Sequence, residues 1–66
     1  MILKKGSKGE EVKKLQESLN IKIDGDFGPA TELAVMRFQA QQGLETDGIV
    51  GPQTWSKIQS RNTSIK

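Results

Sequence analysis

The spacing of hydrophobic residues along the chain predicts three helices. In the first, Val12, Leu15 and Leu19 recur at i, i+3 and i+7, which places them on one face of an amphipathic helix. The positions between them are polar. We expect this helix to run over residues 8–20, with the Ser7 hydroxyl capping its first turn.

The second helix has the clearest start in the chain. Pro29 suits the first helical position, because no helix pairs the N–H of that position and the fixed φ of proline is already helical. Gly28 then lies just outside the helix, and Gly43 is expected to end it as a left-handed cap. The residues that we expect on its buried face are Thr31, Ala34, Val35 and Phe38.

A third, shorter helix starts with the same signal at Pro52. Trp55 and Ile58 are expected to face inward from it. The chain then becomes polar and aperiodic, so we expect the domain to cover residues 1–60 and a tail over residues 61–66 to fray.

An eight-residue block occurs twice. The segment 24–31 returns 23 residues later as 47–54, and five of its eight positions are identical, in the order Asp-Gly-x-x-Gly-Pro-x-Thr. Each copy follows a helix, so the chain carries a tandem unit of helix, Asp-Gly turn and helix start. Units this short cannot bury an apolar face alone, and they pack on each other. We therefore predict a small all-α domain of three helices, without a substantial sheet.

Glycine has a structural role in each copy of the block. In an Asp-Gly pair, glycine supplies a positive φ and aspartate can bond its own backbone. Gly28 and Gly51, which precede the prolines, are also expected to hold backbone conformations that a β-branched residue cannot adopt.

Composition excludes several classes of protein. Sixty-six residues make one domain that buries only about 60% of its unfolded surface. The chain has no cysteine and no histidine, so we expect no disulfide, no metal site and no cofactor. No apolar run approaches the roughly 20 residues that span a bilayer. The N-terminus lacks the apolar region of a signal peptide, so export would depend on sequence outside this chain or on cell lysis.

The net charge of +2 is unevenly distributed. Residues 1–22 hold six lysines and three glutamates, a net of +3, whereas residues 23–66 carry a net of −1. The lysines are interleaved with glutamates, which is typical of a solvated helix face with i,i+4 pairs. A nucleic-acid interface would need a denser basic stripe and stacking aromatic residues. We expect neither nucleic acid nor membrane as a partner.

Catalysis and calcium binding are both poorly supported by the residues present. Asp24-Gly25-Asp26 begins like a calcium loop, but an EF-hand needs a glutamate at the twelfth position, where this chain has Val35. Without histidine or cysteine, the chain also lacks the usual bases and nucleophiles. We expect a binding module and no enzymatic activity.

Together, these motifs resemble the peptidoglycan-binding domain of bacterial and phage cell-wall hydrolases. The likeness covers residues 3–58 and includes both copies of the repeat. The stretch 19–24 is short, as in modules attached to phage endolysins. The residues that carry the resemblance are Leu3, Gly6, Ser7, Gly9, Val12, Leu15, Gln16, Asp24, Gly25, Phe27, Gly28, Pro29, Thr31, Ala34, Val35, Phe38, Gln39, Gly43, Leu44, Asp47, Gly48, Ile49, Val50, Gly51, Pro52, Thr54 and Trp55.

The resemblance implies a non-catalytic, extracellular module that holds an attached hydrolase on the murein layer of the cell wall. We expect it to act as a monomer, with peptidoglycan (glycan strand, stem peptide or both) and the hydrolase as partners. The fold is also similar to the pro-domain of matrix metalloproteinases, so the same architecture can serve protein contacts. The inhibitory device of those pro-domains is a cysteine, which this chain lacks.

Seven residues near the two turns are candidates for contacting peptidoglycan. The carboxylates of Asp24 and Asp47 could accept bonds from sugar hydroxyls or peptide amides, although a structural role in the turns is favoured. Gln16 and Gln39 each follow an apolar core residue, and we favour the interpretation that each amide ties its helix to the adjoining turn. The seven candidates are Asp24, Phe27, Thr31, Gln39, Asp47, Thr54 and Trp55.

The aromatic candidates are Phe27 and Trp55, because sugar rings stack on exposed aromatic surfaces. The chain has three aromatic residues, and Phe38 belongs to the core by its phase in the second helix. A domain this small needs its aromatic residues for packing, so we expect Phe27 and Trp55 to be half-buried, which permits both roles.

An apolar strip gives the alternative function. Leu33, Met36 and Ala40 lie on one helical line beside the core face. An exposed strip of this kind suggests docking on a neighbouring domain or a second copy, and the chain would then be a protein-interaction module. Scattered surface residues without a role are an equally good interpretation of the same pattern.

Overall fold

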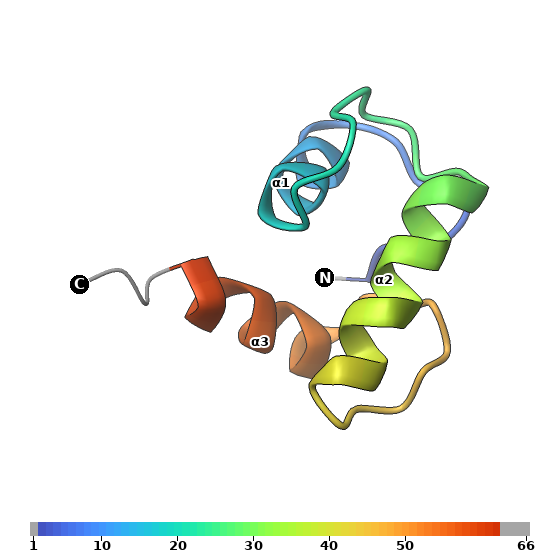
Figure 1. Cartoon of the computed structure of the whole chain (residues 1–66). Coiled ribbons are helices and arrows are strands. Elements are labelled where there is room, and N and C mark those ends of the chain that lie inside the picture. Colours follow the sequence, from blue (N-terminus) through green and yellow to red (C-terminus); the bar gives the residue numbers. More distant parts are fainter. Residues whose placement is uncertain (1, 63–66) are drawn as a thin grey trace.

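The computed structural model describes residues 2–62, and helices are the regular elements among them. In chain order these are α1 (Glu10–Ser18), α2 (Pro29–Gln41) and α3 (Pro52–Asn62). Helices α1 and α3 contact each other and lie on the same side of α2, with the N-terminal segment running among the three (Figure 1). The prediction of a small all-α domain of three helices is confirmed.

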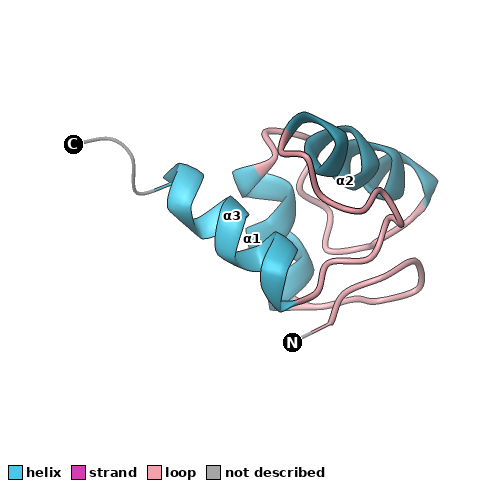
Figure 2. Cartoon of the chain, turned by 90° about the horizontal axis from the view of Figure 1, so that it is seen from below, coloured by secondary structure: helices cyan, strands magenta, loops and turns pink. Residues whose placement is uncertain are grey.

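The N-terminal segment pairs with both Asp-Gly turn regions. The N–H of Leu3 donates to the Val50 carbonyl at 2.9 Å, and the N–H of Val50 donates back to Leu3 at 2.7 Å. Further along, Lys8 forms an isolated antiparallel bridge with Asp26. Outside the helices, the described chain is drawn as loop (Figure 2), so these pairs are short extended pieces and no sheet forms within residues 2–62.

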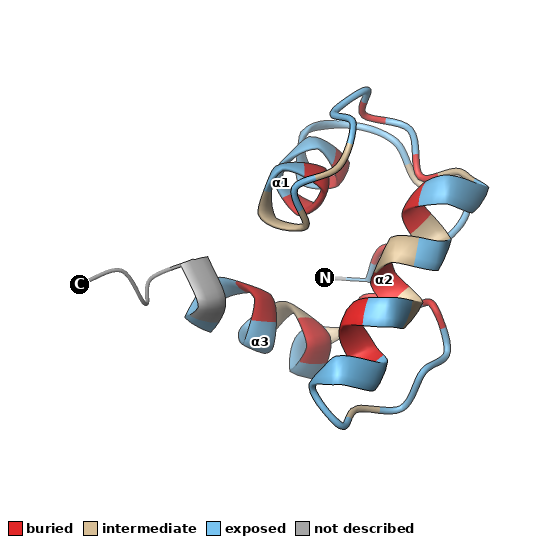
Figure 3. Cartoon of the chain, in the orientation of Figure 1, coloured by how far each residue is buried: buried red, intermediate tan, exposed pale blue. Residues whose placement is uncertain are grey.

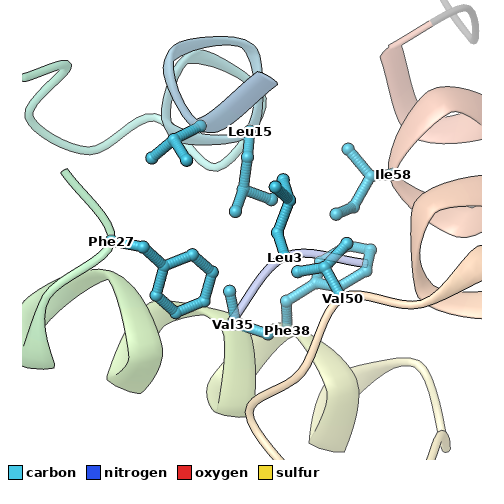
Figure 4. Packing of buried hydrophobic residues seen from close by; sticks show 8 residues of the cluster. Leu3, Leu15, Phe27, Val35, Phe38, Val50 and Ile58 are labelled. Carbon is cyan, nitrogen blue, oxygen red and sulfur yellow. The ribbon is translucent and has the colours of Figure 1, made fainter. Parts of the chain in front are cut away.

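One hydrophobic core lies between the helices and the N-terminal segment (Figure 4). Each helix turns its buried residues inward and its exposed residues to water (Figure 3). Each core side chain is at most 7% exposed, and full burial of a side chain of this kind stabilises the fold by roughly 1.5–3 kcal/mol. The core residues are Leu3, Val12, Leu15, Phe27, Val35, Phe38, Val50 and Ile58.

The two helix starts predicted from proline are confirmed. Pro29 is the first residue of α2 and Pro52 is the first residue of α3. Gly43, just beyond α2, has a φ of +71°, as expected for a left-handed cap. Proline and glycine act within one turn of the backbone, so these boundaries need no information from the rest of the chain.

The predicted cap of the first helix is wrong. Helix α1 begins at Glu10, after Gly9, and no side chain caps it. The Ser7 hydroxyl instead accepts a hydrogen bond from the Lys4 N–H at 3.1 Å. The Ser7 carbonyl accepts the Phe27 N–H at 3.0 Å, so Ser7 is held in the extended segment rather than at the helix start.

Two helix ends also differ from the prediction. Helix α1 ends at Ser18 instead of residue 20, because Asn20 takes a left-handed conformation with a φ of +60°, which ends a helix. Helix α3 continues to Asn62, beyond the end of the hydrophobic pattern. Helical backbone bonds do not require an apolar face, and no glycine or proline interrupts this stretch. The rest of the predicted tail, residues 63–66, lies outside the described residues.

The glycines of the two Asp-Gly pairs combine a positive φ with close neighbours. Gly25 and Gly48 both have a φ of +74°. A Cβ atom on Gly25 would lie 3.1 Å from Lys13 Cε, and one on Gly48 would lie 3.3 Å from Met36 Cγ. Gly28, by contrast, has an extended backbone with a φ of −105° and open space around it. The expectation that the glycines before the prolines are required is therefore wrong.

Candidate binding site

The first turn is built around the buried amide of Gln16. Its Nε2 donates to Asp24 Oδ1 at 2.8 Å, to the Asp26 carbonyl at 3.2 Å and to Thr31 Oγ1 at 3.1 Å. Its Oε1 accepts the backbone N–H of Asp24 at 3.0 Å and that of Gly25 at 2.9 Å. We call these residues the first turn network; it ties α1 to the turn and to the start of α2.

The second turn repeats this arrangement 23 residues later. Gln39 Nε2 donates to Asp47 Oδ1 at 3.1 Å, to the Ile49 carbonyl at 2.9 Å and to Thr54 Oγ1 at 3.2 Å. Its Oε1 accepts the Gly48 N–H at 2.9 Å. This second turn network ties α2 to the turn and to the start of α3. The interpretation that each glutamine holds its helix to the adjoining turn is confirmed by these bonds.

Each turn presents an ionised carboxylate to water. The Asp26 N–H, followed by the Gln16 amide, lowers the pKa of Asp24, and the Ile49 N–H together with the Gln39 amide lowers the pKa of Asp47. In both aspartates the bonds go to Oδ1. Because these bonds go to Oδ1, the second oxygen of each carboxylate can accept a hydrogen bond from a ligand.

Four of the seven candidates are interior residues. Phe27 is 1% exposed and Gln39 is 1% exposed. Thr31 and Thr54 are 4% and 5% exposed, and their hydroxyls accept the glutamine amides. The expectation of a half-buried Phe27 is wrong, because the N-terminal segment pairs with its backbone and the ring enters the core. These four side chains have little accessible surface, and two of them, Gln39 and Thr54, lie in the wall of a groove beside the second turn.

A groove lies beside the second turn, and Asp47 is part of its wall. We call it the Asp47 groove; its volume is about 240 Å³. Glu45 adds a second carboxylate, and no basic residue lines it. Ile2, Leu44, Ile49 and Pro52 supply apolar wall. The structure therefore distinguishes the two aspartates, which the repeat alone makes equivalent, by the groove around Asp47.

Trp55 lies in a different groove. It is half-buried, as expected, and packs against the core. The groove that it lines runs between α1 and α3 and includes Lys14 and Glu17. Thr54, the preceding residue, lines the Asp47 groove instead. The aromatic and acidic candidates are thus not brought together in one site.

Comparison with known proteins identifies the family. The sequence model of the peptidoglycan binding domain matches residues 8–58. The chain belongs to this family. It is a binding module, and the predicted resemblance is confirmed.

Relatives of the peptidoglycan-binding domain include enzymes that are much longer than this chain. It is 48% identical over 64 residues to a zinc D-Ala-D-Ala carboxypeptidase of Streptomyces albus G, covering 85% of this chain and 25% of that protein. The endolysin of Burkholderia phage AP3 is 44% identical, with a TM-score of 0.85 over 88% of this chain and 24% of that one. The chain spans from 19% to 54% of the first curated relatives that it matches.

An isolated domain of similar size is also known. The crystal structure of the N-terminal domain of SleB is 33% identical, with a TM-score of 0.88, and the match covers 91% of this chain and 90% of that one. The likeness therefore extends over nearly the whole of both chains and fixes the fold.

The apolar strip on α2 is exposed at its two ends and half-buried in its middle. Leu33 is 51% exposed and lines a groove of about 330 Å³ with Leu19 and Ile21. Met36 packs close to Gly48 in the second turn, the place that Lys13 takes beside Gly25 in the first. Ala40, like Leu33, is exposed, so docking through Leu33, Met36 and Ala40 stays a prediction.

Sequence reasoning missed several groove residues. Ile2 reaches the Asp47 groove only because the neighbouring Leu3 pairs with Val50. No local sequence pattern predicts this long-range contact. Glu45 could have been found from its position two residues before Asp47. No helix in the described residues is long and apolar enough to cross a membrane. The same residues contain no cluster of three or more metal-ligating side chains.

Proposed function

We propose that this peptidoglycan-binding domain recognises its polymer through the Asp47 groove and holds an attached cell-wall hydrolase on the murein layer. The named relatives support the attached hydrolase, because the matched domain is a small part of each of these longer enzymes. We also propose that one copy suffices and that the domain reaches the wall with its parent protein, by export or by lysis.

The observation that carries the proposal is the free oxygen of Asp47. Its Oδ1 is held by the Gln39 amide and the Ile49 N–H, so the carboxylate is fixed and its Oδ2 is left to accept a further bond. Asp47 itself lines the Asp47 groove. A lowered pKa keeps the group ionised at neutral pH. An ionised carboxylate forms the stronger class of hydrogen bond with an N–H or O–H donor.

The composition of the groove favours the stem peptide as the contacting part of the polymer. Two carboxylates and no basic side chain line the groove, so it favours amide N–H groups and ammonium groups over anions. Apolar wall from Ile2, Leu44 and Pro52 suits the aliphatic part of a peptide side chain. A sugar would find no aromatic surface among these lining residues.

The mechanism is a gain in local concentration. A weak, reversible contact on an insoluble polymer keeps the linked enzyme within reach of many identical bonds, so its effective concentration rises without any new catalytic group. The shallow groove and the single charged contact fit weak binding. Strong binding would hold the enzyme at one place on the wall.

The test is retention of the domain on purified sacculi. Asp47→Asn keeps the shape and the Oδ1 acceptor but removes the charge, which costs about 1.5–3 kcal/mol if a ligand donor is bound. Retention should then fall tenfold or more while the melting temperature stays near that of the wild type. Asp24→Asn is the matched control, since the same change is made in an equivalent network, and it should retain binding.

Sacculi stripped of teichoic acid give the second control. The domain should still be retained on them, because the proposed contact does not involve anionic polymers. Equal retention of the Asp47→Asn and wild-type proteins, with both folded, would refute the Asp47 groove as the site. Loss of all binding on stripping would instead assign the binding to the N-terminal lysines.

A further inference from the structure

The groove between α1 and α3 contains the one aromatic side chain with accessible surface in the described chain. Phe27 is 1% exposed and Phe38 is 2% exposed, whereas Trp55 is half-buried. The groove has a volume of about 330 Å³, near the lower end for small-molecule sites. We call it the Trp55 groove. Its lining residues are Lys14, Glu17, Ser18, Trp55, Ile58 and Gln59.

The rim of this groove offers both a donor and an acceptor. Lys14 and Glu17 are exposed and lie three residues apart on α1, so they are neighbours on one helix face. Their opposite charges make the rim neutral. An anionic polymer would be repelled by Glu17 as much as it is attracted by Lys14. A cationic ligand would be repelled by Lys14 as much as it is attracted by Glu17.

The apolar part of the groove is small and largely aromatic. Ile58 is 1% exposed, which leaves the indole of Trp55 as the main accessible apolar surface. A docking helix or a second copy of the chain would need a wider apolar strip than one ring. A sugar ring needs this combination, because its C–H face packs on an aromatic ring while its hydroxyl and amide groups meet polar partners around the edge.

We propose that the Trp55 groove is a separate carbohydrate site that takes one N-acetylated pyranose ring of the glycan strand. The C–H face of the ring packs on the Trp55 indole, Glu17 accepts from a hydroxyl or the amide N–H, and Lys14 donates to an oxygen. The inference rests on the proposed function in that the sugar belongs to the same polymer. It adds the glycan as a second ligand, bound apart from the stem peptide.

Neighbouring residues at the start of α3 line the two grooves. Thr54 lines the Asp47 groove and Trp55, the next residue, lines the Trp55 groove. The first turn of α3 therefore separates them. A polymer in which peptides branch from a glycan strand could engage both at once, and two weak contacts would act as one stronger contact.

The chain carries its own reporter for this site. Trp55 is the single tryptophan and tyrosine is absent, so fluorescence excited at the long-wavelength edge of indole absorption, where phenylalanine does not absorb, comes from Trp55 alone. Titration with the soluble tetramer of β-1,4-linked N-acetylglucosamine should give a saturable change in emission, with half-saturation on the order of 1 mM or tighter.

Rim variants test the assignment without touching the core. Glu17→Gln and Lys14→Ala should each weaken the tetrasaccharide about fivefold or more, as expected for lost charge-assisted bonds. Glu11→Gln is the matched control, because Glu11 is an exposed glutamate of α1 that does not line the groove, and it should bind as the wild type. All variants are first shown to melt like the wild type.

The outcomes separate this inference from the proposed function. No saturable change up to roughly 10 mM tetrasaccharide, or equal affinity in the Glu17→Gln and Glu11→Gln proteins, overturns the Trp55 groove as a sugar site. If sacculi retention still depends on Asp47, the proposed function stands alone. Tetrasaccharide binding that needs Glu17, together with sacculi retention indifferent to Asp47, would support this site and refute the Asp47 groove.

Discussion

Replacing Gln39 with leucine tests the structural principle of the domain most directly. The amide makes four hydrogen bonds in the second turn network. Two of its partners, the Gly48 N–H and the Thr54 hydroxyl, are buried, and water cannot replace the lost bonds there without opening the turn. The other two partners are only partly buried and can be rehydrated.

The size of the effect follows from these two buried partners. A buried polar group left without its bond costs about 1–3 kcal/mol, so Gln39→Leu should destabilise the domain by about 2–6 kcal/mol. A domain of 66 residues has a total stability of only about 3–10 kcal/mol. The variant should therefore lose a large share of its stability.

Urea unfolding followed by far-ultraviolet circular dichroism measures this loss. The midpoint of the Gln39→Leu protein should fall sharply, and its slope should equal that of the wild type if the unfolded state is unchanged. Gln42→Leu is the control, because Gln42 is exposed at the end of α2 and the same chemical change there should cost less than about 0.5 kcal/mol. A Gln39→Leu protein within about 0.5 kcal/mol of the wild type would refute the view that the network holds the turn.

Three further predictions follow from the same structure. Gly48→Ala should destabilise the domain by about 1 kcal/mol or more, because the φ of Gly48 is positive and an added Cβ would crowd the side chains of Met36 and Glu32. Gly28→Ala should be nearly neutral, and the urea midpoints of the two variants test the difference. Because the folded pKa values of Asp24 and Asp47 are lowered, their stabilisation is present above their ordinary pKa and is lost as pH falls below about 4. Between about pH 5 and about pH 2, the melting temperature of the Asp24→Asn/Asp47→Asn protein should therefore fall less than that of the wild type. An equal fall in the two proteins would contradict the prediction. Leu3→Ala should cost about 2–5 kcal/mol by cavity formation, because this side chain is 7% exposed; a melting temperature unchanged from the wild type would show that the N-terminal segment is not part of the core.

Part of the site could be read from the sequence because it repeats. The two Asp-Gly turns and the glutamines that hold them recur at the same spacing. Four of the five bonds of Gln16 have a counterpart at Gln39; the exception is the Asp24 N–H, since the Asp47 N–H donates to the Glu45 carbonyl. The repeat could not say which copy meets a ligand. That difference comes from the N-terminal segment, because the pairing of Leu3 with Val50 brings Ile2 into the wall of the groove around Asp47.

The sequence by itself determined the local structure: helix starts at Pro29 and Pro52, a left-handed cap at Gly43, and a repeat that requires packing. Proline, glycine and helical periodicity act over a turn or two of backbone, so their effects are visible in neighbouring letters. The tertiary structure decided where two aromatic side chains lie: Phe27 enters the core, and Trp55 faces α1 rather than the Asp47 groove. Burial and the grouping of side chains depend on contacts between segments far apart in the chain, and no short pattern contains that information.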